Sequence, residues 1–156
     1  MSITMSGGNK LLAFLDKLEQ DVKKNESVTV EVGYFPEDKI GDTPAAAIAA
    51  RQEFGVPKGN IPPRPTMRPG VRMTRKKISE IAKELGVKNI SDLPDKIGEA
   101  AVESIKDEIK NKNRPALSET TKKIRRERKI KPTTSDKPLI DSGAMLDAVK
   151  YKKSSS

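Results

Sequence analysis

The sequence predicts a mixed protein of helices and strands, folded as one domain in which helices predominate. Three features indicate this: several segments with the apolar period of a helix, one segment with the two-residue alternation of a strand, and a proline-dense connection. A length of 156 residues suits one domain. Because only 34% of the residues are hydrophobic and 3% are aromatic, we expect a thin aliphatic core that a partner surface would help to cover.

The first two predicted elements are a helix and a strand. An apolar stripe with helical spacing predicts an amphipathic helix over residues 9–24. Its members are Leu11, Leu15, Leu18 and Val22. Valines at alternate positions from Val28 to Val32, followed by Tyr34, predict a half-buried strand with one face in the core.

A short alanine-rich helix and a stiff connection come next. Thr43 is expected to cap this helix, Pro44 to occupy its first position and Gly55 to end it. Its small side chains either pack very close to a neighbouring element or form a flat face for another subunit. Residues 56–69 contain five prolines, which predicts an extended arm that can be neither a helix nor a central strand.

Helical periods return in the second half of the chain. They predict one helix from Val71 to Gly86 and another over residues 95–112. Ser118 is expected to cap a short polar helix that ends at Arg126.

The C-terminal end is expected to be short and partly unfolded. Asp141 is a predicted cap of a last short helix. The polar residues 152–156 have the composition of a disordered tail, so the predicted domain spans residues 1–151.

The positive charge is concentrated near the C-terminus. The net charge is +9, and residues 114–131 contribute +6 of it through eight basic and two acidic residues. The basic residues are Arg114, Lys122, Lys123, Arg125, Arg126, Arg128, Lys129 and Lys131. They lie in a predicted basic helix and loop over residues 113–138. This region has no aromatic side chain on which a base could stack, so we expect at most contacts with nucleic-acid phosphates, without recognition of base sequence. The alternative is a solubilising, partly mobile surface.

Several classes of function are excluded by composition. The chain has neither Cys nor His, which excludes disulfides, thiolate zinc sites, cysteine nucleophiles and Ser-His-Asp triads. Glu99, Glu103 and Asp107 share a helix with lysines and are expected to form a solvated face. No glycine-rich phosphate loop is present, so we expect no enzyme activity, cofactor or metal.

No apolar run approaches the roughly 20 residues of a membrane span and no signal peptide is evident, which predicts a soluble protein made in a cytoplasm.

The most specific pattern is an ordered series of short segments over about three quarters of the chain. The segments are VGYFP (32–36), QEFG (52–55), IPPRPTMRP (61–69), PALS (115–118) and KPLIDSGAM (137–145). The alanine-rich helix lies between the first and the second segment.

This series resembles the small phage virion proteins of the head–tail junction, the neck or tail-completion family that includes minor tail protein Z. Members carry a strand ending in a VG-type turn, a short alanine-rich helix ending in Glu-Phe-Gly, an Ile-Pro-Pro-Arg-Pro arm, long helices and a late Pro-Leu-Ile-Asp segment. The chain departs from that pattern at Thr66-Met67, where two bulky apolar residues are usual, and in its long 128–136 loop. It also stops soon after Tyr151, where relatives continue into strands, which weakens the expectation of a C-terminal sheet.

The resemblance implies an α+β protomer, with a small antiparallel sheet packed with several helices and an extended proline-rich arm. It further implies assembly into a ring between capsid portal and tail, six-fold by preference and twelve-fold as a possibility. Other phage neck and tail proteins would then be partners, and DNA would pass through the lumen without sequence-specific contacts.

In such a ring the arm is expected to reach a neighbouring subunit or an adjacent ring, because a pre-extended arm loses less entropy on docking. The expected interface residues are Phe54, Gly55, Ile61, Pro62, Pro63, Arg64, Pro65 and Arg68. Arg64 and Arg68 would bond carboxylates or carbonyls of the partner. The alternative is an arm that packs on its own protomer and links two helices. We also expect Phe54 to be buried and Gly55 to have a positive φ.

A different class of function is a nucleic-acid-binding accessory protein that grips phosphates through residues 114–131. Steep salt dependence of DNA binding by an isolated monomer would favour it, whereas salt-insensitive ring formation without DNA affinity would favour the neck role.

Overall fold

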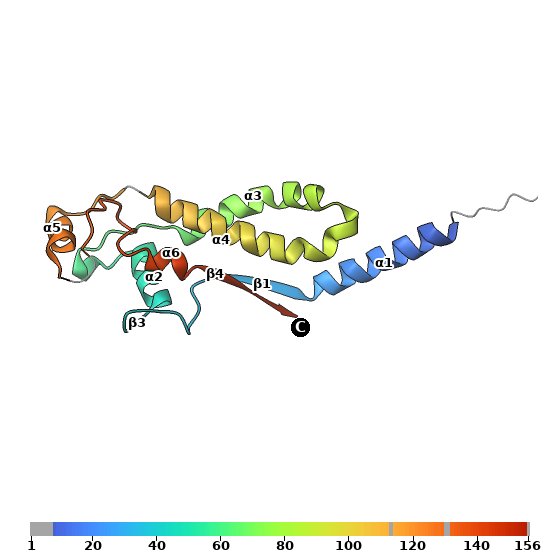
Figure 1. Cartoon of the computed structure of the whole chain (residues 1–156), viewed down its shortest axis with the longest axis horizontal. Helices are drawn as coiled ribbons and strands as arrows, with labels where there is room; N and C mark the ends of the chain where they lie inside the picture. The colour runs from blue at the N-terminus through green and yellow to red at the C-terminus, as the bar shows by residue number, and fades with distance from the viewer. Residues whose placement is uncertain (1–7, 113, 130–131, 156) are drawn as a thin grey trace, which may run out of the picture.

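The structure is a computed structural model, and it describes residues 8–112, 114–129 and 132–155. It combines helices with two small antiparallel sheets, which confirms the predicted α+β class. Figure 1 shows an elongated molecule with a helical hairpin in the middle, α1 (Gly8–Glu26) extending from one end and α5 (Glu119–Glu127) at the other.

The hairpin consists of α3 (Met67–Leu85) and α4 (Leu93–Asn111), joined by the 3-10 segment η2 (Val87–Asp92). Its two helices pack very closely. A Cβ atom at Gly70 would lie 2.6 Å from Cγ1 of Ile105, so only glycine allows this approach. Helix α3 begins at Met67, four residues before the predicted start, so its first turn includes Pro69. Pro57–Gly59 form a 3-10 turn and Val56 pairs with Ile61, so the predicted extended arm over residues 56–69 is not shown.

A two-stranded sheet lies against α4. Strand β1 (Val28–Gly33) pairs antiparallel with β4 (Lys150–Ser155), and Val32 lies opposite Tyr151. The prediction of a disordered tail is therefore wrong for residues 152–155, whereas Ser156 lies outside the described residues. The polar composition suggested disorder, but the backbone hydrogen bonds of the ladder order this segment, and Lys152 and Lys153 pair with Glu37 and Asp95.

The core is as thin as the composition predicts. Its largest fully buried side chains are Ile105, Ile109 and Val149. Leu139 joins them, and partly buried side chains of β1, α3 and α6 (Ala144–Asp147) pack around this cluster. The core thus holds together α3, α4, the sheet and the segment that precedes β4.

The remaining elements lie beside the hairpin. Strands β2 (Lys39–Ile40) and β3 (Thr43–Pro44) form a small hairpin before α2 (Ala45–Phe54), and the 3-10 turn η1 (Pro57–Gly59) follows α2.

The predicted helix caps have mixed outcomes. Ser118 caps α5 as predicted, since its hydroxyl accepts a hydrogen bond from the Thr121 N–H at 3.2 Å. Thr43 is not the cap of α2, because it lies in β3 and Pro44 precedes the helix. Asp141 is not the cap of α6 either: Gly143 holds that position, and the Asp141 carboxylate binds an arginine instead.

Candidate assembly surface

Glu53 joins two of the sequence segments. It lies on the buried side of α2 and is 5% exposed. Its carboxylate accepts hydrogen bonds from the backbone N–H groups of Thr66 (2.6 Å), Met67 (3.0 Å) and Arg68 (3.3 Å). The first N–H groups of a helix have no partner within the helix, and the helix dipole favours an anion there. Glu53 therefore caps α3 from another part of the chain.

The environment of Glu53 keeps it ionised. Burial alone would raise the pKa of this carboxyl, but the hydrogen bonds from the three amides and from the Arg68 guanidinium outweigh it. The pKa of Glu53 therefore lies below its ordinary value. Glu53 lies inside the QEFG motif, but its capping role was not predicted from the sequence. Its burial could have been inferred from its spacing. Glu53 follows Ala45 and Ala49 at four-residue intervals, so all three residues lie on the buried face of α2.

Arg64 joins the proline-rich segment to the segment that follows α4. Its side chain is buried, and it donates from Nε to the Pro115 carbonyl at 2.8 Å and from Nη2 to the Ala116 carbonyl at 3.1 Å. Burial lowers the pKa of Arg64, with a smaller contribution from the charge of Arg125, but a guanidinium remains protonated in proteins. Arg64 thus has bonds within its own protomer, as the alternative interpretation of the arm requires.

The turn at Gly55 leads from α2 into this segment. Gly55 has φ 75°, as predicted, and an added Cβ would lie 2.8 Å from the Ile61 carbonyl oxygen. The Val56 N–H donates to that same oxygen at 2.8 Å. The turn therefore requires both the backbone conformation and the small size of glycine.

Phe54 is not buried as predicted, because its side chain is 68% exposed. Neighbouring residues on a helix point about 100° apart, so the burial of Glu53 turns Phe54 toward solvent. The Arg68 guanidinium lies 5.4 Å from the centre of the Phe54 ring. An exposed aromatic ring with a cation stacked on it is thus available at the surface.

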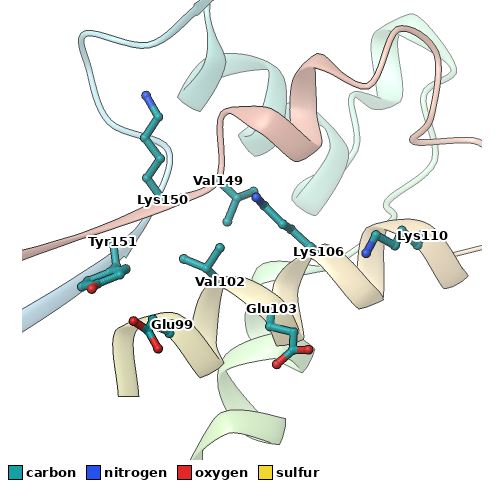
Figure 2. Close-up of a pocket in the computed structure, with 8 residues that line it drawn as sticks. All are labelled: Glu99, Val102, Glu103, Lys106, Lys110, Val149, Lys150 and Tyr151. Carbon is teal, nitrogen blue, oxygen red and sulfur yellow. The ribbon is translucent and has the colours of Figure 1, made fainter. Parts of the chain in front are cut away.

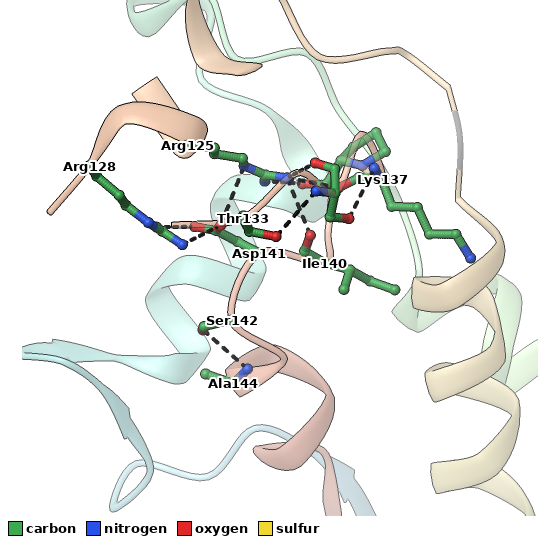
Figure 3. A network of polar contacts seen from close by, with 10 residues as sticks. Arg125, Arg128, Thr133, Lys137, Ile140, Asp141, Ser142 and Ala144 are labelled. Atoms are coloured by element: carbon green, nitrogen blue, oxygen red, sulfur yellow. Dashed lines mark hydrogen bonds and ion pairs between the residues drawn. The ribbon is translucent and has the colours of Figure 1, made fainter. Parts of the chain in front are cut away.

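Two of the eight predicted basic residues organise the last motif segment (Figure 3). The Arg125 side chain, 11% exposed, donates to the carbonyls of Lys137 (2.9 Å), Pro138 (2.9 Å) and Ile140 (3.3 Å). Arg128 forms a two-point ion pair with Asp141 at 2.7 and 2.8 Å. These two arginines therefore hold the loop before α6.

The other basic residues of the segment face solvent to different degrees. Lys122 pairs with Glu119 at 2.7 Å and Arg126 with Asp136 at 3.7 Å, on the surface of the protomer. Arg114, Lys123, Arg126 and Lys129 are exposed, and Lys131 lies outside the described residues. The exposed part of the basic segment is thus smaller than the sequence suggests.

No metal centre is indicated within residues 8–112, 114–129 and 132–155, which contain no group of three or more potential ligands. Two of the three α4 carboxylates considered from the sequence pair with lysines of the same helix: Glu99 with Lys96 at 2.7 Å and Asp107 with Lys110 at 3.6 Å. In the same part of the chain, every helix is too short or too polar to span a membrane.

Comparison with known proteins found no matching family model, no matching curated protein and no matching solved structure. The resemblance to the neck and tail-completion family therefore rests on the quoted segments.

Proposed function

We propose that the chain is a structural protein of a phage head–tail junction, where it forms a ring of the neck or tail-completion complex that joins tail to capsid around the DNA channel. One observation carries this proposal. Charged side chains link successive motif segments: Glu53 of the second segment binds residues 66–68 of the third, and Arg64 of the third binds residues 115–116 of the fourth. Arg125, which lies between the last two segments, binds residues 137–140 of the fifth. A chance similarity of composition would not place charged motif residues on the backbone of other motif segments.

The burial of apolar residues also supports a subunit of an assembly. The protomer has few fully buried large side chains, while several large apolar side chains on α1 and Phe54 on α2 are exposed. Exposed apolar groups of this kind mark interaction surfaces in soluble proteins. A protomer with a thin core and exposed apolar groups gains stability by burying them against other subunits.

The basic segment has a defined role in this proposal. Arg114, Lys123, Arg126 and Lys129 would face the DNA lumen or a neighbouring acidic ring, and Arg125 and Arg128 would act within the protomer. The alternative function, an accessory protein that grips phosphates, uses the same exposed cations. With two arginines engaged internally, that grip is weaker than the sequence charge suggests.

The role in the virion is tested in a phage from which the gene for this chain has been deleted. We expect DNA-filled heads and separate tails in electron micrographs, and joined particles again when the chain is supplied from a plasmid. The purified protein should give ring-shaped particles of one size by native mass measurement. Normal particles without the gene would contradict the proposal.

The role of the exposed cations is tested by the triple variant Lys123→Gln, Arg126→Gln, Lys129→Gln, which leaves Arg125 and Arg128 intact. Defective joining or DNA loss from particles, with an unchanged melting temperature of the protomer, is the expected result. Normal infectious yield would identify these residues as ordinary solvated surface. DNA binding by a monomer that falls steeply with salt would instead support the accessory protein.

A further inference from the structure

Helix α1 carries an apolar stripe that is exposed to solvent. Leu12 is 61% and Leu15 47% exposed, and Phe14 and Val22 are also exposed. Figure 1 shows α1 extending outward from the start of β1 and away from the helical hairpin. It contacts the hairpin at η2. A face of exposed apolar side chains on a projecting helix marks a surface for a partner.

A groove of matching character lies on the other part of the molecule, between α4 and the start of β4 (Figure 2). It has a volume of about 580 Å³, and its apolar lining comes from Val102, Val149 and Tyr151. In Figure 1, α1 of the same chain points away from α4 and from the start of β4. An occupant of the groove would therefore come from a second molecule.

The dimensions of stripe and groove agree. The stripe from Leu12 to Val22 spans about 15 Å along the helix axis, at 1.5 Å per residue. The part of α4 that lines the groove, from Glu99 to Lys110, spans about 16 Å by the same measure. The stripe and the groove are therefore of about the same length.

The charges of the two helices specify a direction. Along α4, the groove is lined first by Glu99 and Glu103 and then by Lys106 and Lys110. On α1, Glu19 borders the apolar stripe, and Lys23 follows one turn later. An antiparallel arrangement that places Glu19 opposite Lys106 also brings Lys23 near Glu103, whereas a parallel one with the same first pair opposes Lys23 to Lys110. The present pairs of Glu19 with Lys23 and of Glu99 with Lys96 are exposed and exchangeable.

We propose that α1 of one copy lies antiparallel to α4 in the groove of a second copy. Each copy then offers two different surfaces, so the contact is heterologous and continues from copy to copy. It gives a ring where the rotation between copies closes and an open filament where it does not. This inference rests on the proposed function in one respect: both require the chain to associate with copies of itself. It adds the contact that joins the subunits.

The apolar half of the contact is tested with Leu15→Asp. Because Leu15 is exposed in the protomer, the variant should fold normally, with unchanged circular dichroism, and self-associate at least about tenfold more weakly in sedimentation velocity. Gln20→Asp adds the same charge on the opposite face of α1 and should associate like the wild type. Equal association of wild type and Leu15→Asp would overturn this contact and leave the neck proposal intact.

The pairing of the two surfaces is tested by cross-linking, which the absence of cysteine makes clean. When a Glu19→Cys chain and a Lys106→Cys chain are mixed and oxidised, they should form disulfide-linked dimers that contain one chain of each variant. The double variant should form a ladder of covalent oligomers. A mixture of Glu19→Cys with Lys123→Cys, on α5, serves as the control and should not cross-link above background.

Two results would overturn the contact. One is a mixture with Lys106→Cys that cross-links no better than the control. The other is a wild-type chain that stays monomeric at all concentrations, in which case the phage lacking the gene still tests the neck proposal separately.

Discussion

The two halves of the molecule are held together by different kinds of interaction. The helical hairpin and the β1–β4 sheet surround an apolar cluster built on Ile105 and Ile109. The other half, which contains most of the motif residues, depends on Glu53, Arg64 and Arg125. These charged side chains have little exposure and bind backbone groups of other segments. Apolar cores accept many side chains of similar volume, whereas buried polar networks depend on particular donors and acceptors.

This difference explains which half contains the recognisable sequence motifs. An arginine that binds two or three carbonyls cannot be exchanged for a lysine without loss of geometry. The segments around such residues therefore carry a specific sequence, while the hairpin requires only a period of apolar residues. We expect substitutions in the two halves to differ in size and in pH dependence.

The largest effect is expected in the apolar half. Ile105→Ala removes a fully buried side chain and leaves a cavity beside α3, which should lower the free energy of unfolding by about 4 kcal/mol. Ile124→Ala, at a 62% exposed position on α5, is the matched control and should change it by less than about 0.5 kcal/mol. Urea unfolding measures both, and similar values for the two variants would show that Ile105 is not in the core.

A smaller effect is expected at the turn that begins the motif half. Gly55→Ala introduces a Cβ at φ 75° that collides with the Ile61 carbonyl, and we expect a loss of about 3 kcal/mol from strain and displacement. Gly41→Ala separates the two causes, because Gly41 has φ 62° and a Cβ there has no contact within 4 Å. That variant should lose about 1 kcal/mol. Equal losses would mean that the close approach to Ile61 does not matter.

Glu53→Gln is expected to cost about 2 kcal/mol at neutral pH, because a neutral amide replaces the charged acceptor of the α3 N–H groups. The pKa of Glu53 is lowered in the folded state, so the stabilisation is complete above the ordinary value of 4.5 and is lost as pH falls through the folded pKa. The difference between wild type and variant should therefore disappear in acid. Melting curves between pH 7 and pH 2 measure it, and a difference independent of pH would exclude a charged cap.

The long helices and the first strand were predictable because each has an apolar period, whereas the short helices were predicted from residues typical of helix ends. The extra turn at the start of α3 was not, because the first N–H groups are bound by Glu53, 13 residues earlier. Strand β4 was missed for a similar reason: its lysines and serines show no apolar alternation, and its order comes from pairing with β1.

The candidate site was predictable as a set of motifs but not as a set of contacts. The positive φ of Gly55 followed from the helix end that the sequence shows. The roles of Arg125 and Arg128 did not, because a run of basic residues gives no indication of which ones fold back on the carbonyls of residues 137–140 or on Asp141. Charge in the sequence therefore overstated the charge available to a partner.

The smallest effect is expected for the ion pair of Arg128 and Asp141, which is partly exposed in the motif half. A double-mutant cycle with Arg128→Gln and Asp141→Asn should give a coupling energy of about 1 kcal/mol, because two-point geometry strengthens a pair that water otherwise screens. The pair of Arg126 and Asp136, at 3.7 Å and more exposed, is the control and should give a coupling close to zero. Unfolding in 0.05 M and 1 M NaCl measures both cycles, and salt should reduce the first coupling. If the two couplings were equal, Arg128 would be one more surface cation, and the loop before α6 would depend on Arg125 for its position.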